Sequence, residues 1–290
     1  MGHTAIPGTI DIPSSVLREI VRRALAEDLG GRGDITSQAT IPLEAWSRFE
    51  LRSRTTGVLA GRAATDEALA QVDANIECDW HLDDGQRLST GDRIATLSGP
   101  ARSILTAERT ALNFLGRLSG IATLTCAYVD RVEGTSARIT HTRKTTPGLR
   151  ALELAAVAAG GGALHRFGLD DAILIKDNHV AVCGNVAEAV RRARRFAGHM
   201  TRVAVEIDRL DQLFEAIEAG AESILLDNFT LQDMRAAVEW TADFNVVLEA
   251  SGGVDLQSVR AIAETGVDVI SVGAITHSAP NLDLGLDALD

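Results

Sequence analysis

Lysine is scarce in this sequence. Of 28 lysine and arginine residues only two are lysines, Lys144 in TRKTTPGLR and Lys176 in ILIKDNH. A lysine ammonium is compact and flexible, whereas an arginine guanidinium is a broad planar fork. The two lysines are therefore candidate functional residues, with chance as the alternative explanation.

Cysteines and long apolar runs are also rare. Three cysteines, Cys78, Cys126 and Cys183, lie far apart without a CxxC or Cys/His pattern. This spacing argues against a zinc site or a disulfide framework, and we expect three buried small hydrophobic side chains. No stretch reaches transmembrane length, and residues 1–15 lack the basic and apolar segments of a signal peptide. We expect a soluble, cytoplasmic protein.

Positive charge is in the minority. The net charge is -12 and the isoelectric point is near 5.0, which argues against a general nucleic-acid or anionic-membrane surface. Any anionic ligand must therefore be bound in a local cationic pocket. A length of 290 residues with 46% apolar content suits one large α/β domain or a barrel with a smaller companion.

The first hundred residues predict a small domain of mixed structure. Residues 14–30 have apolar residues at helical spacing, with serines at the N-cap and Gly30 as a stop. The Gly-rich loop GRGDITS follows. From about residue 45 to 100, short alternating runs separated by Gly and Asp turns predict a mostly antiparallel sheet that carries one helix near 62–73.

Residues 101–132 predict one long helix. Its glycines, Gly116 and Gly120, mark either close packing or a break. Arg109 is unusual because leucines lie four residues before it and three residues after it, which places a guanidinium on the apolar stripe. We expect Arg109 to need a partner or a ligand.

Strands and helices alternate after residue 135. Six short β-branched or apolar runs recur: ARITH, AILI, RVAVEI, SILL, NVVLEA and DVISVG. Helical stretches such as NVAEAVRRARRFAG and LDQLFEAIEAG separate them. This rhythm predicts a parallel α/β barrel, and six units instead of eight predict an incomplete one. Within the first of these helices, RRARR is expected to be a solvated face.

Charged and polar residues follow almost every predicted barrel strand. Loops at the carboxyl ends of the strands converge on one mouth, where barrel enzymes place their sites. These strand-end residues are Arg143, Lys144, Lys176, Asp177, Asn178, His179, Glu206, Asp227, Asn228, Glu249, Ser251, Gly252, Gly253 and Gly273. We expect the two lysines to line one shared cavity.

The strand-end residues divide into three chemical roles. Glycine loops after the last two strands, Ser251-Gly252-Gly253 and Ser271-Val272-Gly273, suit a phosphate, because glycine lets backbone N–H groups approach it. Glu206 and Asp227 could hold a hard cation such as Mg2+, or pair with arginines. A third set supplies positive charge for more than one phosphate, with ordinary helix-end charge as the alternative for two of its members, His165 and Arg166. This set is Arg143, Lys144, His165, Arg166 and Lys176.

Six motifs resemble the quinolinate phosphoribosyltransferase family in order and spacing. They are ERTALNFLGRLSGIAT, TRKTTPGLR, HRFGLDDAILIKDNH, LLDN, LEASGGV and ISVGAITHS, and the likeness runs from ALAEDLGGRGDITS to the C-terminus. The resemblance implies an N-terminal α/β sandwich over residues 1–118, which the tail 277–290 can join, and an incomplete catalytic α/β barrel over 119–276. Thr146 departs from the pattern, because an apolar residue is expected there, and we expect this change to alter packing and not charge.

The same resemblance implies a glycosyltransferase of the pentosyl class. Quinolinate and phosphoribosyl pyrophosphate would give nicotinate mononucleotide, pyrophosphate and carbon dioxide in NAD biosynthesis, with Mg2+ as cofactor, in a homodimer with shared sites. By matching motif, Arg109 would reach the partner's quinolinate and Lys144 would lie near the pyrophosphate. The other implied roles are a dicarboxylate pocket of Arg143, His165, Arg166 and Lys176, ribose and Mg2+ contacts from Glu206 and Asp227, and a 5-phosphate cradle of Ser251, Gly252, Gly253, Gly273 and His277.

Three other functions compete with this interpretation. Lys176 could form a Schiff base in an aldolase, which requires a desolvated, neutral amine. A non-catalytic phosphosugar-binding barrel would bind ligand without releasing pyrophosphate. A paralogue on the same fold, such as the molybdenum-utilisation relative, would use another acceptor.

Overall fold

The computed structural model describes residues 11–289, which form two compact units. The described part of the first unit comprises residues 11–126, Thr145–Gly161 and residues 275–289, and the second comprises Ala127–Lys144 and Gly162–Ala274. Most of the segment examined for a signal peptide lies outside the described residues. The domain boundary between residues 118 and 119 stays a prediction.

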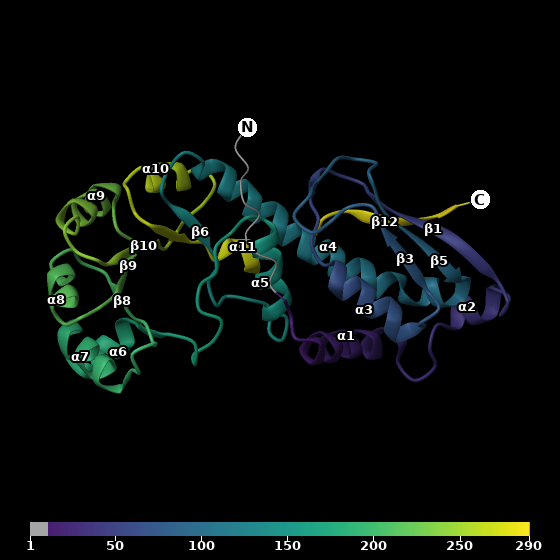
Figure 1. Cartoon of the computed structure of the whole chain (residues 1–290), viewed down its shortest axis with the longest axis horizontal. Coiled ribbons are helices and arrows are strands. Elements are labelled where there is room, and N and C mark those ends of the chain that lie inside the picture. Colours follow the sequence, from purple (N-terminus) through teal and green to yellow (C-terminus); the bar gives the residue numbers. More distant parts are fainter. Residues whose placement is uncertain (1–10, 290) are drawn as a thin grey trace. The chain divides into compact units, whose positions relative to one another are not determined.

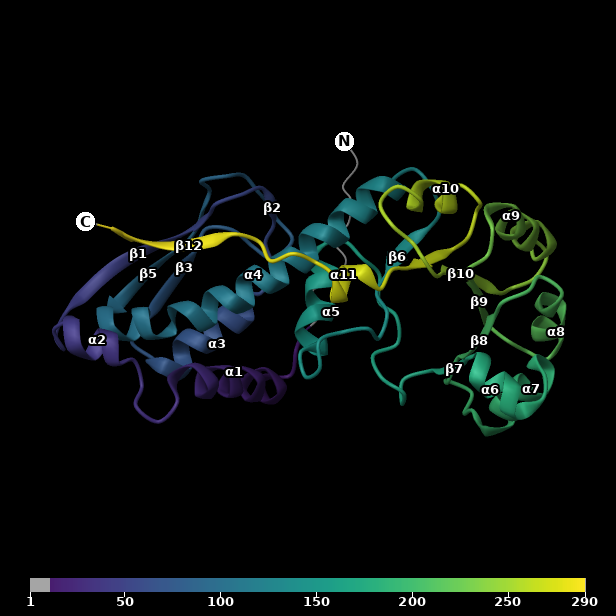
Figure 2. The same ribbon diagram turned by 180° about the vertical axis from the view of Figure 1, so that it is seen from behind.

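The sheet of the first unit is antiparallel, as its alternating pattern predicts. Its strand order is β12-β1-β5-β3, and β2 and β4 form a separate pair. The bounds are β1 Trp46–Ser53, β2 Gly57–Val58, β3 Glu77–Trp80, β4 Arg87–Leu88, β5 Arg93–Pro100 and β12 Leu284–Leu289. The last strand of the chain thus lies beside the first, as Figure 2 shows.

Helices cover one face of this sheet and complete an α/β sandwich (Figure 1). They are α1 Ser14–Leu29, α2 Ile35–Thr40, α3 Arg62–Val72 and α4 Ala101–Val132, and α4 continues beyond Cys126 into the second unit. The first unit also contains α5 Arg150–Ala159. The predicted serine N-cap of α1 is wrong: Pro13 is the N-cap, without a side-chain cap bond. Proline presets a φ close to the helical value, so the first turn forms without a hydroxyl cap.

The core of the first unit joins the sheet to α4. Ile94 of β5 and the α4 residues Ile104 and Leu115 have no exposed surface. The glycines of α4 mark close packing, and the helix is unbroken. A Cβ on Gly120 would collide with the carbonyl oxygen of Pro280, so only glycine lets the C-terminal segment approach the helix here.

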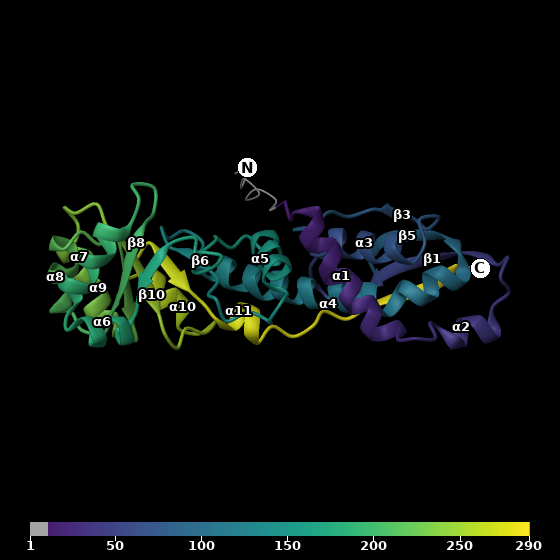
Figure 3. The ribbon, with the colours of Figure 1, turned by 90° about the horizontal axis from the view of Figure 1, so that it is seen from below.

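The second unit holds six parallel strands in the order β6-β11-β10-β9-β8-β7. The strands are β6 Arg138–Thr140, β7 Ile173–Ile175, β8 Val203–Ile207, β9 Ser223–Asp227, β10 Val247–Ser251 and β11 Val269–Ser271. The helices are α6 Asp177–Cys183, α7 Val186–Phe196, α8 Gln212–Glu218, α9 Leu231–Trp240 and α10 Val259–Ala263. They form an arc outside the strands (Figure 1), and Figure 3 shows the same elements from below. Strands β6 and β7 are the two edges of this order, so the barrel is incomplete, as predicted.

Side chains alternate between the two faces of each barrel strand. In β8, Val203, Val205 and Ile207 are at most 2% exposed, whereas Ala204 and Glu206 are half-buried. The apolar set packs beneath the helices, so the other set faces the barrel interior. This alternation directs the polar strand-end residues inward.

Two sequence expectations concern the described residues as a whole. The three cysteines are free, but each is only partly buried, so the expectation of three fully buried side chains is wrong. Burial still raises the pKa of the Cys78 thiol to about 12. Between residues 11 and 289, no helix combines the length and the apolarity needed to cross a membrane.

Candidate active site

Lys176 and Glu206 form an ion pair at the carboxyl edge of the sheet. Lys176 follows β7 and Glu206 lies on the adjacent β8, with Nζ 2.6 Å from Oε2. The His179 ring caps the following helix by accepting from the Lys176 backbone N–H at 2.9 Å. A Schiff-base aldolase needs a free, desolvated amine, whereas the Lys176 amine is exposed and already hydrogen-bonds to a carboxylate, so the geometry argues against that role.

Asp227 and Ser251 are direct neighbours on β9 and β10. The next residue, Asn228, has a positive φ of 56°, donates its backbone N–H to the Ser251 carbonyl at 2.9 Å and donates its amide to Asp227 Oδ2 at 2.9 Å. Gly252 has a φ of 94°, and a Cβ there would collide with the Asn228 side chain. Two neighbouring loops thus meet at a position that only glycine can occupy.

Gly252→Ala is expected to weaken binding of a phosphorylated substrate by about tenfold or more, because the alanine displaces Asn228 and the loop. Gly134→Ala is the matched control: Gly134 has a φ of 81° in the same unit, and a Cβ there meets open space. Thermal unfolding and substrate titration would compare the variants. If both substitutions weakened substrate binding equally, the effect at Gly252 would be explained by backbone strain alone.

Arg143 and Arg166 are two partly buried arginines whose charges act on each other. Arg166 is half-buried and donates Nη1 to the Ala172 carbonyl at 3.0 Å. Burial, and then the charge of Arg143, lower the pKa of Arg166. Among the described residues, the Nε atoms of both arginines are buried without a hydrogen-bond partner. Two like charges with unsatisfied donors are costly unless an anion neutralises them, so this pair is suited to bind an anionic ligand.

His165 uses both ring nitrogens within the protein. Its Nδ1 accepts from the Arg166 backbone N–H at 2.8 Å, so the ring proton is on Nε2, which faces Glu249 Oε2 at 3.4 Å. The backbone N–H of His165 donates to Nε2 of buried His141 at 3.0 Å. In this arrangement His165 holds the main chain of Arg166, and its contact with a dicarboxylate stays a prediction.

Glu249 faces a cavity of about 340 Å³ inside the barrel. It is 4% exposed, and within residues 11–289 its Oε1 has no hydrogen-bond partner. His165 and Arg166 also line this cavity, whereas Lys144 and Lys176 are exposed residues outside its lining. The cavity therefore contains only part of the cationic set, and a hollow shared by the two lysines stays a prediction.

Four other predicted site residues lie on β11, on α11 and in loops. Lys144 is exposed after β6, and its backbone N–H donates to Thr142 Oγ1 at 3.1 Å. Ser271 is buried and donates to the Ala250 carbonyl at 3.4 Å. Gly273 precedes α11 (Ala274–His277), whose last residue, His277, is exposed in the first unit with Nδ1 2.6 Å from Ser278 Oγ.

Arg109 does not lie on the buried stripe of α4. It is exposed, whereas the buried face includes Ile104, Ala107 and Ala111. The prediction that Arg109 interrupts the apolar stripe is therefore wrong, because the buried face is rotated away from it. Water can solvate the guanidinium, which leaves it available to a ligand or a second chain.

The carboxylates of Glu206 and Asp227 suit a divalent cation that is bound together with a substrate. Mg2+ in phosphate sites is usually held by one or two carboxylates together with phosphate oxygens and water. Glu206 and Asp227 end adjacent parallel strands, and both are oxygen donors. No cluster of three or more His, Cys, Asp or Glu side chains in the described part of the chain is arranged as a metal site. Most of the ligand oxygens would therefore come from the substrate.

Sequence reasoning missed several residues that hold this site together. His141 lies directly after β6, and Arg117 and Glu153 form a buried ion pair in the first unit. For Arg117, the only signal in the sequence was a charged residue at helical spacing among apolar neighbours. The same signal was misleading at Arg109.

The architecture defines an α/β sandwich linked to an open parallel α/β barrel with charged residues at its strand ends. Family models match both parts: the quinolinate phosphoribosyl transferase N-terminal domain over residues 34–119 and its C-terminal domain over residues 121–287. The chain therefore belongs to the quinolinate phosphoribosyltransferase family.

Individual relatives agree over almost the whole chain. A probable carboxylating nicotinate-nucleotide pyrophosphorylase from Bacillus subtilis is 45% identical over 93% of this chain and 93% of its own length. The Mycobacterium leprae enzyme of that name is 45% identical over 96% of this chain and 99% of its own. The solved structure of the nicotinate-nucleotide pyrophosphorylase from Francisella tularensis covers 96% of this chain and 98% of its own, with a TM-score of 0.92 and 41% identity.

Proposed function

We propose that this protein transfers the phosphoribosyl group of phosphoribosyl pyrophosphate to quinolinate and removes one carboxylate. The products are nicotinate mononucleotide, pyrophosphate and carbon dioxide, in NAD biosynthesis. The observation that carries the proposal is the Arg143–Arg166 pair, whose buried donors and mutual repulsion call for an anionic ligand. The name of the family to which the chain belongs supplies the identity of that ligand.

The charges of the site account for both chemical steps. Arg143, Arg166 and Lys176 would orient the dicarboxylate so that the ring nitrogen faces the anomeric carbon of the ribose. The carbon–oxygen bond to pyrophosphate breaks, Lys144 stabilises the departing charge, and a carbon–nitrogen bond forms. The carbon–carbon bond to the adjacent carboxylate then breaks and carbon dioxide leaves. The pyridinium stabilises the electron pair left on the ring carbon, and a proton from solvent bonds to that carbon.

Magnesium is the proposed cofactor. Glu206 and Asp227 would hold it, with the ribose hydroxyls and phosphate oxygens of the substrate as further ligands. When bound, it neutralises part of the diphosphate charge. We propose in addition that the protein acts in the cytoplasm as a homodimer, in which the exposed Arg109 contributes to the site of the partner.

One assay tests the reaction. Carbon dioxide and pyrophosphate release would be measured with quinolinate and phosphoribosyl pyrophosphate, and nicotinate would serve as the control acceptor without the second carboxylate. We expect equal amounts of both products from quinolinate. If pyrophosphate were released only with an acceptor other than quinolinate, the protein would instead be a paralogue with the same fold and a different reaction.

Removal of divalent cations is expected to lower the rate by at least about 100-fold, because the departing pyrophosphate loses its charge neutralisation. The measurement is the initial rate after chelation with EDTA, and added Mg2+ should restore it. The melting temperature should hardly change, because Glu206 already pairs with Lys176 within the protein. An unchanged rate after chelation would contradict the metal requirement.

A further inference from the structure

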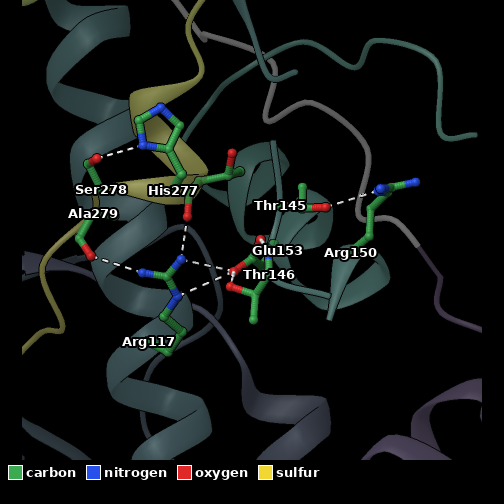
Figure 4. Close-up of polar contacts among 9 residues, drawn as sticks. Arg117, Thr145, Thr146, Arg150, Glu153, His277, Ser278 and Ala279 are labelled. Atoms are coloured by element: carbon green, nitrogen blue, oxygen red, sulfur yellow. Dashed lines mark hydrogen bonds and ion pairs between the residues drawn. The ribbon is translucent and has the colours of Figure 1, made fainter. Parts of the chain in front are cut away.

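Arg117 is the centre of a partly buried polar cluster in the first unit (Figure 4). From α4 it donates Nη2 to Glu153 Oε1 at 2.9 Å and Nη1 to the Ala279 carbonyl at 2.9 Å. Nη2 also donates to the Thr276 carbonyl. One guanidinium thus joins α4 to α5 and to both sides of the turn that contains His277.

Glu153 carries the cluster to a second segment. It has no exposed surface, and it accepts from the Thr146 hydroxyl at 2.7 Å and from the Thr146 backbone N–H at 3.0 Å. Thr146 thus introduces no charge, but it does more than alter packing, because its hydroxyl hydrogen-bonds to a buried carboxylate. Thr146 is only two residues from Lys144.

The cluster is an inefficient way to gain stability. A buried ion pair often contributes less to folding than apolar residues of similar volume, because both charges lose their hydration. Its hydrogen bonds fix backbone groups in two segments, residues 145–148 and 276–279. Each segment adjoins a predicted phosphate-binding residue, Lys144 in one case and His277 in the other.

We infer that Arg117 and Glu153 are positioning residues, which fix the backbone just after Lys144 and on both sides of His277 for the phosphate groups of phosphoribosyl pyrophosphate. Neither residue touches substrate in this assignment. The inference rests on the proposed function, and it predicts an effect on one of the two substrates. Quinolinate has no phosphate groups, so its binding should depend little on the cluster.

Glu153→Gln tests this inference, because it keeps the shape of the side chain and removes its charge. We expect the KM for phosphoribosyl pyrophosphate to rise by about tenfold, with the KM for quinolinate within about twofold of the wild type. Isothermal titration with each substrate alone gives the same comparison without turnover. Thr146→Val keeps the ion pair and removes one hydrogen bond, so a smaller rise for the same substrate is expected even if Glu153→Gln folds poorly.

Glu50→Gln is the matched control. Glu50 is a buried carboxylate of β1 in the same unit, it pairs with Arg52 and Arg93, and it adjoins none of the predicted site residues. We expect Glu50→Gln to lower the melting temperature about as much as Glu153→Gln does, and to leave both KM values unchanged. The inference would be overturned if, in Glu153→Gln and Thr146→Val, the KM values for the two substrates changed equally or did not change at all. A wild-type protein that binds neither substrate would instead refute the proposed function.

Discussion

Lys144→Ala is expected to lower kcat by about 100- to 1,000-fold, the usual effect of removing one group that stabilises charge in a transition state. The side chain is exposed, so its truncation removes little packing and should change the free energy of unfolding by less than about 0.5 kcal/mol. Steady-state kinetics and thermal unfolding of the same preparation measure the two effects. Retained activity would contradict the assigned role.

Two further variants separate the role of Lys144 from a general loss of positive charge. Arg191→Ala removes an exposed cation from α7, where Arg191 lies 3.7 Å from Glu188, and neither kcat nor stability should change appreciably. Lys144→Arg keeps the charge on a broader group, and we expect only partial recovery of activity, because a guanidinium does not reproduce the compact ammonium. Full recovery would show that charge alone explains the lysine.

Arg109→Ala is expected to inactivate a homodimer and to be rescued by mixing. If each site takes Arg109 from one subunit and Lys144 from the other, a dimer of one Arg109→Ala and one Lys144→Ala subunit contains one intact site. Random reassembly of equal amounts should then recover about a quarter of the wild-type activity, since half of the dimers are mixed and each has one intact site.

The readout is pyrophosphate release after the two inactive proteins are mixed under conditions that exchange subunits. A mixture of Lys144→Ala with Lys176→Ala is the control. Each of these subunits carries its change in its own barrel, so no mixed dimer contains an intact site. Activity no greater than the sum of the separate variants would count against a shared site.

The fold was predictable because its information is local and periodic. The alternating runs between residues 45 and 100, and the strand and helix alternation after residue 135, each matched the observed elements. The errors arose where one residue was judged from its neighbours alone. Arg109 looked buried from its flanking leucines, but the buried face of a helix depends on what packs against it.

The site was predictable only as a set of charged strand ends. Lys176 follows β7, and Glu206 and Asp227 lie near the carboxyl ends of β8 and β9, so topology brings them to one edge of the sheet. The partners that orient such residues could not be predicted, because the contacts join distant segments. His165 meets Glu249 across 84 positions of sequence, and no local pattern specifies that contact.

The position of β12 has a consequence for how the chain folds while it is being synthesised. The sheet formed by residues 46–100 receives its edge strand, Leu284–Leu289, from a segment that a ribosome adds about 180 residues later. Until then β1 presents unpaired backbone groups, which are prone to join strands of other nascent chains. Truncation of only the last few residues would leave that exposure permanent, so a short C-terminal deletion should cause aggregation.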